Sequence, residues 1–282
     1  MAGAQFSSSD IDGCIASLGS LDSEIREAAL DRLDAMIVQG GISTDRLVSL
    51  SDELTNDLLR GVGDHISDGV FKRSFSALIV GAIISYDELC DQKPGNSTQS
   101  FITREIYDDW FLKSIRYFTS ENDLRGYTSE SGWAHAAAHG ADLLRELAFS
   151  RFCSVERQKI ILSELSSKII RPTVYPFLYN EDNRLSRVAV TILLRNELRL
   201  DDYKEWISSI IRSMPLGGWM DVSKDDRANI AWNNTVNFLR AFYFNVFLGC
   251  KKLKDSPLYD REIPNKEAIL GLLADALRSI DR

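Results

Sequence analysis

Two histidines four residues apart, His135 and His139, have the types and the spacing that could do chemistry. They lie in the stretch GWAHAAAHGAD, whose apolar spacing predicts a helix over 131–149. At 100° per residue, these histidines fall within about 60° of Asp142 and Glu146 on such a helix. Imidazoles at this spacing can reach one metal ion from a single helix, and Asp142 could supply a third ligand.

Three interpretations of this polar face stay open. An enzyme could use one histidine as a general base, or both histidines with Asp142 as metal ligands, although zinc proteases carry a glutamate where this chain has Ala136. The face could instead bind a peptide or a small ligand without any cofactor. It could also be structural, with His135 and His139 hydrogen-bonded to neighbouring helices. Because the face is expected to border a wet groove, we predict that alanine at either histidine costs less than about 2 kcal/mol.

The elements that must position these residues are helices. Apolar residues recur with a period of 3.6 along most of the chain, and only six prolines interrupt it. Sustained alternation typical of strands is absent, so the predicted class is all-α. The breaks DQKPGNST, RPTVYP and PLGGW are too short for domain linkers, which predicts one domain over 1–282. The predicted helices span 21–38, 43–60, 68–86, 101–119, 131–149, 154–170, 182–198, 201–213, 226–249 and 265–281.

Several of these helices share one sequence pattern. Segments starting at residues 21, 67 and 181 each place an acidic cap ahead of a hydrophobic residue, an arginine and a run of small residues. Segments starting at 130 and 225 occupy the equivalent places, about 45 to 60 residues apart, as in helical-repeat arrays. The pattern Asp-x-x-Ile-Arg-x-x-Ala of 22–29 resembles the start of the second helix of a HEAT repeat. We therefore predict an α/α superhelix, a HEAT/armadillo-like solenoid, of about ten to twelve helices.

Residues 125–144, RGYTSESGWAHAAAHGADLL, resemble a bacterial family catalogued as domain of unknown function 2785. The family pattern is R-G-Y, a short spacer, then G-W-A-H-A-x-A-H-x-A-D. The resemblance extends to FKRSFSAL (71–78), EDNRL (181–185) and NFLRAFYF (237–244), and so covers most of the chain from about residue 60 onward. It implies an α/α superhelix related to HEAT and armadillo arrays, and it implies no assigned activity.

Polar stripes on the equivalent helices point to a binding groove. If these helices form the inner wall of successive repeats, the stripes line one concave surface. Arginine forks favour carboxylates or phosphates, and aligned amides favour an extended backbone. We therefore expect a binding module that holds a peptide, a protein segment or an anionic small ligand, with an enzyme as the alternative. The expected groove residues are Arg73, Trp133, His135, His139, Asp142, Arg184, Arg187, Asn233, Asn237 and Arg240. Trp219, beside two glycines, could add a lid, although core packing is the commoner role of a tryptophan.

Composition excludes some partners and favours one compartment. The net charge is −8, with 41 acidic and 33 basic residues and no dense basic run, which disfavours nucleic acid. The longest uncharged apolar stretch, 74–86, is shorter than the roughly 20 residues that cross a bilayer, so no membrane span is expected. The four cysteines form no C-x-x-C pair, and the first residues lack a signal-peptide pattern. We expect a reduced, cytoplasmic protein.

Overall fold

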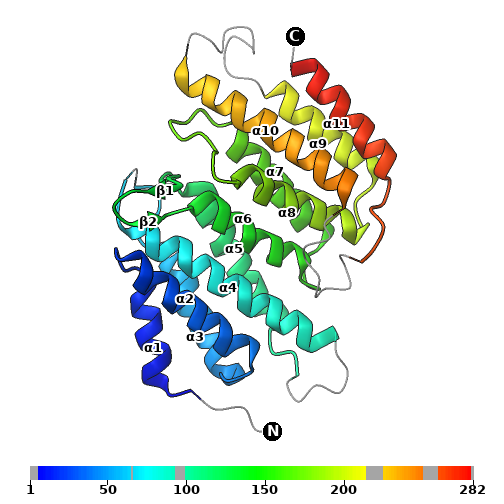
Figure 1. The fold of residues 1–282 in the computed structure, drawn as a ribbon. Coiled ribbons are helices and arrows are strands. Elements are labelled where there is room, and N and C mark those ends of the chain that lie inside the picture. The colour runs from blue at the N-terminus through cyan, green and yellow to red at the C-terminus, as the bar shows by residue number, and fades with distance from the viewer. Residues whose placement is uncertain (1–5, 65, 93–98, 214–224, 250–259, 281–282) are drawn as a thin grey trace. The chain divides into compact units, whose positions relative to one another are not determined.

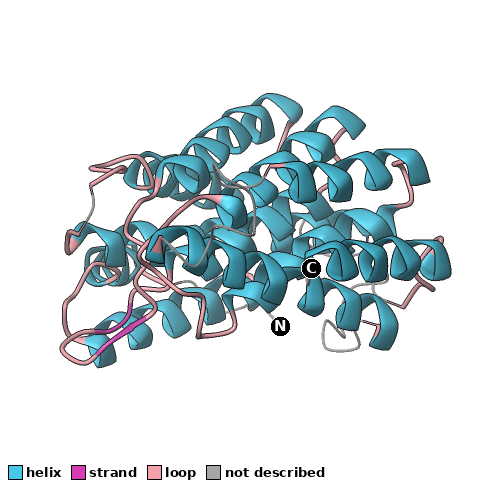
Figure 2. Ribbon diagram, turned by 90° about the horizontal axis from the view of Figure 1, so that it is seen from above, coloured by secondary structure: helices cyan, strands magenta, loops and turns pink. Residues whose placement is uncertain are grey.

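The computed structural model describes residues 6–64, 66–92, 99–213, 225–249 and 260–280. These residues form eleven helices and one short two-stranded hairpin. Helices make up most of the ribbon in Figure 2, and the predicted all-α class is confirmed. The chain divides into two compact units, 1–152 and 153–282, which we describe separately. The expectation of a single domain stays a prediction. Trp219 lies outside the described residues.

The first unit contains six helices and the hairpin among its described residues. Within it α2, α4 and α6 pack side by side, while α3 contacts α4 and α5, α5 contacts α6, and α1 contacts α2 (Figure 1). The elements are α1 (Ser8–Ser17), α2 (Ser23–Val38), α3 (Thr44–Asp57), α4 (Gly69–Gln92), α5 (Arg104–Ser120), β1 (Tyr127–Thr128), β2 (Gly132–Trp133) and α6 (Ala136–Phe149).

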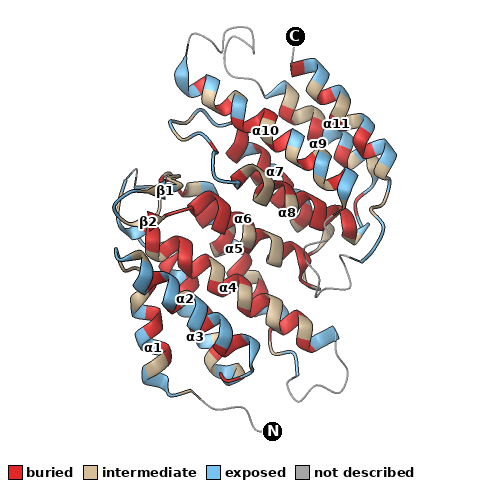
Figure 3. Cartoon of the chain, in the orientation of Figure 1, coloured by how far each residue is buried: buried red, intermediate tan, exposed pale blue. Residues whose placement is uncertain are grey.

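Helix α4 forms the centre of this unit. It contacts α2, α3 and α6, and most of its side chains are buried, as Figure 3 shows in red. Among the described helices it is also the one that is long and apolar enough to cross a membrane, but 67% of its most apolar window is buried inside the protein. A core helix has the same length and composition, because its side chains are apolar on all sides. The apolar character of α4 therefore indicates burial.

The second unit contains the remaining five described helices. Helix α10 contacts α7, α8 and α11, and α9 contacts α7 and α11. Its core includes Trp206, whose indole nitrogen donates to the Leu162 carbonyl at 2.7 Å and whose ring contacts Phe238 and Phe242 at 6.2 and 5.9 Å between centroids. The helices are α7 (Val155–Ile170), α8 (Glu181–Arg195), α9 (Leu200–Arg212), α10 (Asp226–Leu248) and α11 (Lys266–Ile280).

Local sequence explains most helix boundaries. The predicted cap Asp22 accepts from the amides of Glu24 and Ile25 at 2.9 and 3.3 Å, and Ser43, Thr103 and Ser154 cap α3, α5 and α7 in the same way. Every helix from α2 to α11 matches a predicted segment, and the number of described helices lies within the predicted range. Helix α1 is missing from the prediction because it is short and carries few apolar residues.

Candidate functional site

The histidine segment begins with a hairpin where the sequence predicts a helix. Tyr127 pairs with Trp133 across the two strands, and helix α6 starts only at Ala136. His135 precedes the helix with left-handed backbone angles, φ 51° and ψ 30°, and its side chain makes no capping bond. Its amide instead donates to the Arg125 carbonyl at 2.9 Å. The predicted helix over 131–149 is therefore wrong at its start, because strand pairing overrides the local 3.6 periodicity.

Arg26 of α2 holds this hairpin in place. Its guanidinium is buried and donates to the carbonyl of Ser131, just before the second strand, and to that of Trp133 within the strand. It also stacks over Phe71 and Phe75, 4.3 and 4.9 Å from the ring centres. Burial lowers the pKa of Arg26 from its ordinary value. The buried guanidinium of Arg26 thus links α2 to both the hairpin and α4.

On α2 a charged residue is buried and its apolar neighbour is not. The Ile25 side chain is 52% exposed, whereas Arg26 is fully buried. Helix α2 also approaches the second strand closely at Ser23. A Cβ at Gly132, whose φ is +69°, would lie 2.8 Å from the Cβ of Ser23. Glycine is required there for both its backbone conformation and its size.

The two histidine rings are packed among aromatic rings. His135 stacks on Trp133 with centroids 4.6 Å apart, and it meets His139 edge to face at 5.4 Å. His139 in turn meets Phe75 of α4 at 5.2 Å. His135 and His139 are only 6% and 5% exposed, so the expected wet face is corrected to a buried one. The reason is the hairpin, which lays the Trp133 ring on His135.

The other groove candidates near the histidines differ in burial. Trp133 and Asp142 are half-buried. The Asp142 Oδ1 atom lies 3.6 Å from Nη1 of Arg145, which is one turn further along α6. Over the described ranges, no group of three or more histidine, cysteine, aspartate or glutamate side chains could hold a metal ion together. Within the described residues, His135, His139 and Asp142 therefore do not form a set of metal ligands.

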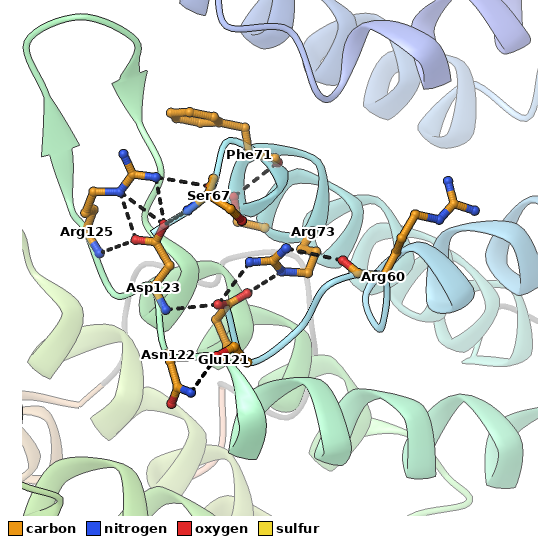
Figure 4. Close-up of polar contacts among 10 residues, drawn as sticks. Arg60, Ser67, Phe71, Arg73, Glu121, Asn122, Asp123 and Arg125 are labelled. Atoms are coloured by element: carbon orange, nitrogen blue, oxygen red, sulfur yellow. Dashed lines mark hydrogen bonds and ion pairs between the residues drawn. The ribbon is translucent and has the colours of Figure 1, made fainter. Parts of the chain in front are cut away.

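Arg73, another predicted groove residue, lies in the interior instead (Figure 4). Its Nε and Nη2 donate to the two carboxylate oxygens of Glu121 at 2.5 and 3.1 Å, and both side chains are at most 2% exposed. A buried guanidinium needs such a carboxylate, because an uncompensated charge is costly away from water. The groove role of Arg73 is thus corrected to a structural one.

The same polar network anchors the loop that leads into the hairpin. Glu121 accepts from the Asp123 amide at 3.0 Å, and the buried Asp123 carboxylate accepts from Arg125 at 2.7 and 2.8 Å. Ser67, just before α4, donates its amide to Asp123 at 3.2 Å, as Figure 4 shows. Apolar periodicity gives no indication that these acidic residues are buried. The stretch ENDLRGY does carry a signal, since carboxylates beside an arginine often pair with it.

In the second unit, the predicted stripe on α8 is partly structural. Thr191 is fully buried, and its hydroxyl donates to the Arg187 carbonyl at 3.0 Å. Arg195 donates to the carbonyl of Cys153 and to the Glu197 carboxylate at 3.1 and 2.9 Å. Arg184 and Arg187 are half-buried.

Helix α10 carries an accessible stripe of amides and one arginine, which we call the α10 polar face. Asn229, Asn233 and Arg240 are exposed, and Asn237 is half-buried. Asn233 donates to the carbonyl and side-chain oxygens of Asn229 at 2.8 and 3.3 Å. The side chains of Asn237 and Arg240 make no hydrogen bond or ion pair with any residue that the structure describes. Their binding capacity is therefore unused within the described chain.

The same helix ends in exposed aromatic residues. Phe244, Phe247 and Leu248 are 57%, 52% and 65% exposed, and the Tyr243 ring lies 5.8 and 6.3 Å from those of Phe244 and Phe247. We call these four residues the α10 apolar end. Lys266 of α11 donates to the Phe247 carbonyl at 2.8 Å. Along its accessible side, α10 thus changes from amides through a cation to apolar rings.

These features define an all-α protein of packed helices with a polar helix face that is exposed to solvent. The family model described as "Protein of unknown function (DUF2785)" matches residues 58–244. The chain belongs to this family. The matched region contains the hairpin, the histidines and the α10 polar face. No match was found among curated proteins, and none among solved structures.

Proposed function

We propose that the protein is a cytoplasmic helical-repeat binding module and that the α10 polar face is part of a groove for an extended peptide. The observation that carries this proposal is the state of Asn237 and Arg240. Both side chains are accessible, and neither is engaged by any described residue. Amide and guanidinium groups that stabilise a fold form hydrogen bonds within it. Groups without such bonds can form them with a ligand.

The packing of the helices supports a repeat architecture. Helices α2, α4 and α6 lie beside one another in the first unit, and α8 lies beside α10 in the second. These five helices lie in the similar sequence segments that start at residues 21, 67, 130, 181 and 225. Stacked helix pairs of this kind build α/α superhelices, whose inner helices present an extended surface for a ligand. We propose that α10 is one of these inner helices.

The spacing of the amides suits an extended peptide. Asn229, Asn233 and Asn237 follow one another at intervals of four residues, or about 6 Å along the helix. An extended chain advances about 6.7 Å for every two residues. Successive asparagines can therefore meet alternate peptide groups, and each amide offers both a donor and an acceptor to them.

The histidine segment supports no second function. His135 and His139 are buried and packed against Trp133 and Phe75. A general base must come within hydrogen-bonding distance of a substrate proton. Rings held in this way fit the structural interpretation better than the enzymatic one.

A peptide-display selection tests the proposal. Short random peptides are selected on the full-length wild-type protein, and their affinities are then measured for the double variant Asn233→Ala, Asn237→Ala. We expect affinity to fall by about tenfold or more, since the peptide backbone loses its amide partners. Asn56→Ala, an exposed amide on α3, is the matched control and should change nothing. Equal affinity for the double variant, or failure to select any peptide, would contradict the proposal.

A further inference from the structure

We infer that the peptide held by α10 carries an acidic side chain and an apolar side chain two residues apart. This inference rests on the proposed function and names the ligand class more closely. It follows from the order of groups along the accessible side of α10, where Arg240 lies between Asn237 and Phe244.

Arg240 supplies the charge complementarity. It is exposed and forms no ion pair with a described residue, whereas Arg212 and Arg278 in the same unit are paired with Glu205 and Asp275 at 2.5 and 2.8 Å. A guanidinium presents a planar fork of donors that matches a carboxylate. In a chain of net charge −8, such an arginine favours an acidic group on the ligand over a basic one.

Phe244 supplies the neighbouring apolar contact. It follows Arg240 by four residues, or about 6 Å, and its ring is 57% exposed beside Tyr243. In an extended peptide, side chains two residues apart lie on the same side and about 6.7 Å from one another. A peptide that places a carboxylate on Arg240 therefore places the side chain two positions away on Phe244.

The exposed rings also explain why a small anion is a poorer occupant. Inorganic phosphate can engage Arg240, but it leaves Phe244, Phe247 and Leu248 in water. An acidic peptide with an apolar side chain uses the cation and covers part of the apolar end. Removing apolar surface from water is favourable in proportion to the area covered.

The selected peptides test the inference directly. We expect them to be enriched in aspartate or glutamate two positions from an aromatic or aliphatic residue. Arg240→Ala and Phe244→Ser should each weaken their binding by about tenfold. The exposed Arg261, which forms no ion pair with a described residue, gives the control variant Arg261→Ala, and it should bind like the wild type.

Charge reversal separates recognition from general loss of binding. Selection on Arg240→Glu should replace the acidic residue of the recovered peptides with lysine or arginine. A peptide whose glutamate is changed to glutamine should bind wild type and Arg240→Ala equally, because its partner for Arg240 has been removed. Retained preference for acidic peptides by Arg240→Glu would overturn the inference.

The outcomes distinguish this inference from the proposed function. Peptides that depend on Asn233 and Asn237 but lack the acidic and apolar pair would overturn only the inference. Peptides indifferent to the asparagines would overturn both. Two further results would assign α10 to another occupant: displacement of the peptides by millimolar inorganic phosphate, or a dimer of the free protein that Phe244→Ser dissociates in sedimentation.

Discussion

The histidine segment and the α10 polar face look alike in sequence and differ in the structure. Both present polar side chains at intervals of three or four residues, and both were expected to face a groove. His135 and His139 are buried against Trp133 and Phe75, whereas Asn233 lies in solvent. Polar residues at helical spacing therefore do not identify a binding face until their burial is known.

The difference has a simple physical origin. A polar group that loses its water must find a partner inside the protein. Arg73 is therefore paired with a carboxylate, and Arg26 contacts backbone carbonyls and aromatic rings. An exposed amide such as that of Asn233 keeps its water until a ligand replaces it. The buried arginines stabilise the fold. The exposed amide can exchange its hydrogen bonds to water for hydrogen bonds to a ligand.

The largest effect is expected from Glu121. Glu121→Ala leaves the guanidinium of Arg73 buried without a counter-ion, and we expect the free energy of unfolding to fall by about 3 to 5 kcal/mol. Urea denaturation of the full chain measures this loss. Glu205→Ala is the control, because its pair with Arg212 is exposed and should contribute less than about 1 kcal/mol. If both variants lost similarly little free energy of unfolding, the buried pair of Arg73 and Glu121 would not stabilise the first unit.

A smaller but clear loss is expected from His139. His139→Ala removes a buried ring that contacts His135 and Phe75, and we expect it to cost about 2 to 4 kcal/mol. This exceeds the limit of about 2 kcal/mol predicted from the sequence for a wet face. His139→Phe keeps a ring in place and should recover part of the loss in a thermal melt. A cost for His139→Ala below about 1 kcal/mol would restore the groove interpretation.

The smallest effect is expected from the α10 polar face. Asn237→Ala and Arg240→Ala should each change the free energy of unfolding by less than about 0.5 kcal/mol, because neither side chain has a partner among the described residues. Asn234 on the same helix is the matched control. It is buried and bonds Phe177 and Tyr175 at 2.8 and 3.2 Å, so Asn234→Ala should cost about 1 to 3 kcal/mol. Equal losses at positions 234 and 237 would remove the distinction between fold and binding face.

Helices and their boundaries were largely predictable from the sequence. Apolar periodicity located α2 to α11, and the cap at Asp22 was correct in detail. Such features depend on residues within a few positions of one another, so a single sequence contains them. The family was also recognisable from the sequence, and the family model matches residues 58–244.

The hairpin and the buried charges could not be predicted in this way. The left-handed His135 exists because Arg125 and Trp133 take part in a hairpin, and Arg26 is buried because α2 packs near that hairpin. Arg26 and Trp133 are 107 positions apart in the chain, and the hydrogen bond from the His135 amide reaches back ten positions to Arg125. Periodicity contains no information about such partners.

The sequence by itself determined that the chain is helical, where most helices begin and end, and to which family it belongs. Only the tertiary structure decided that His139 and Arg73 serve the fold and that Asn237 and Arg240 remain accessible. The reason is that helical periodicity assigns a residue to a side of its helix, whereas the neighbouring helices and the hairpin determine whether that side is exposed to water.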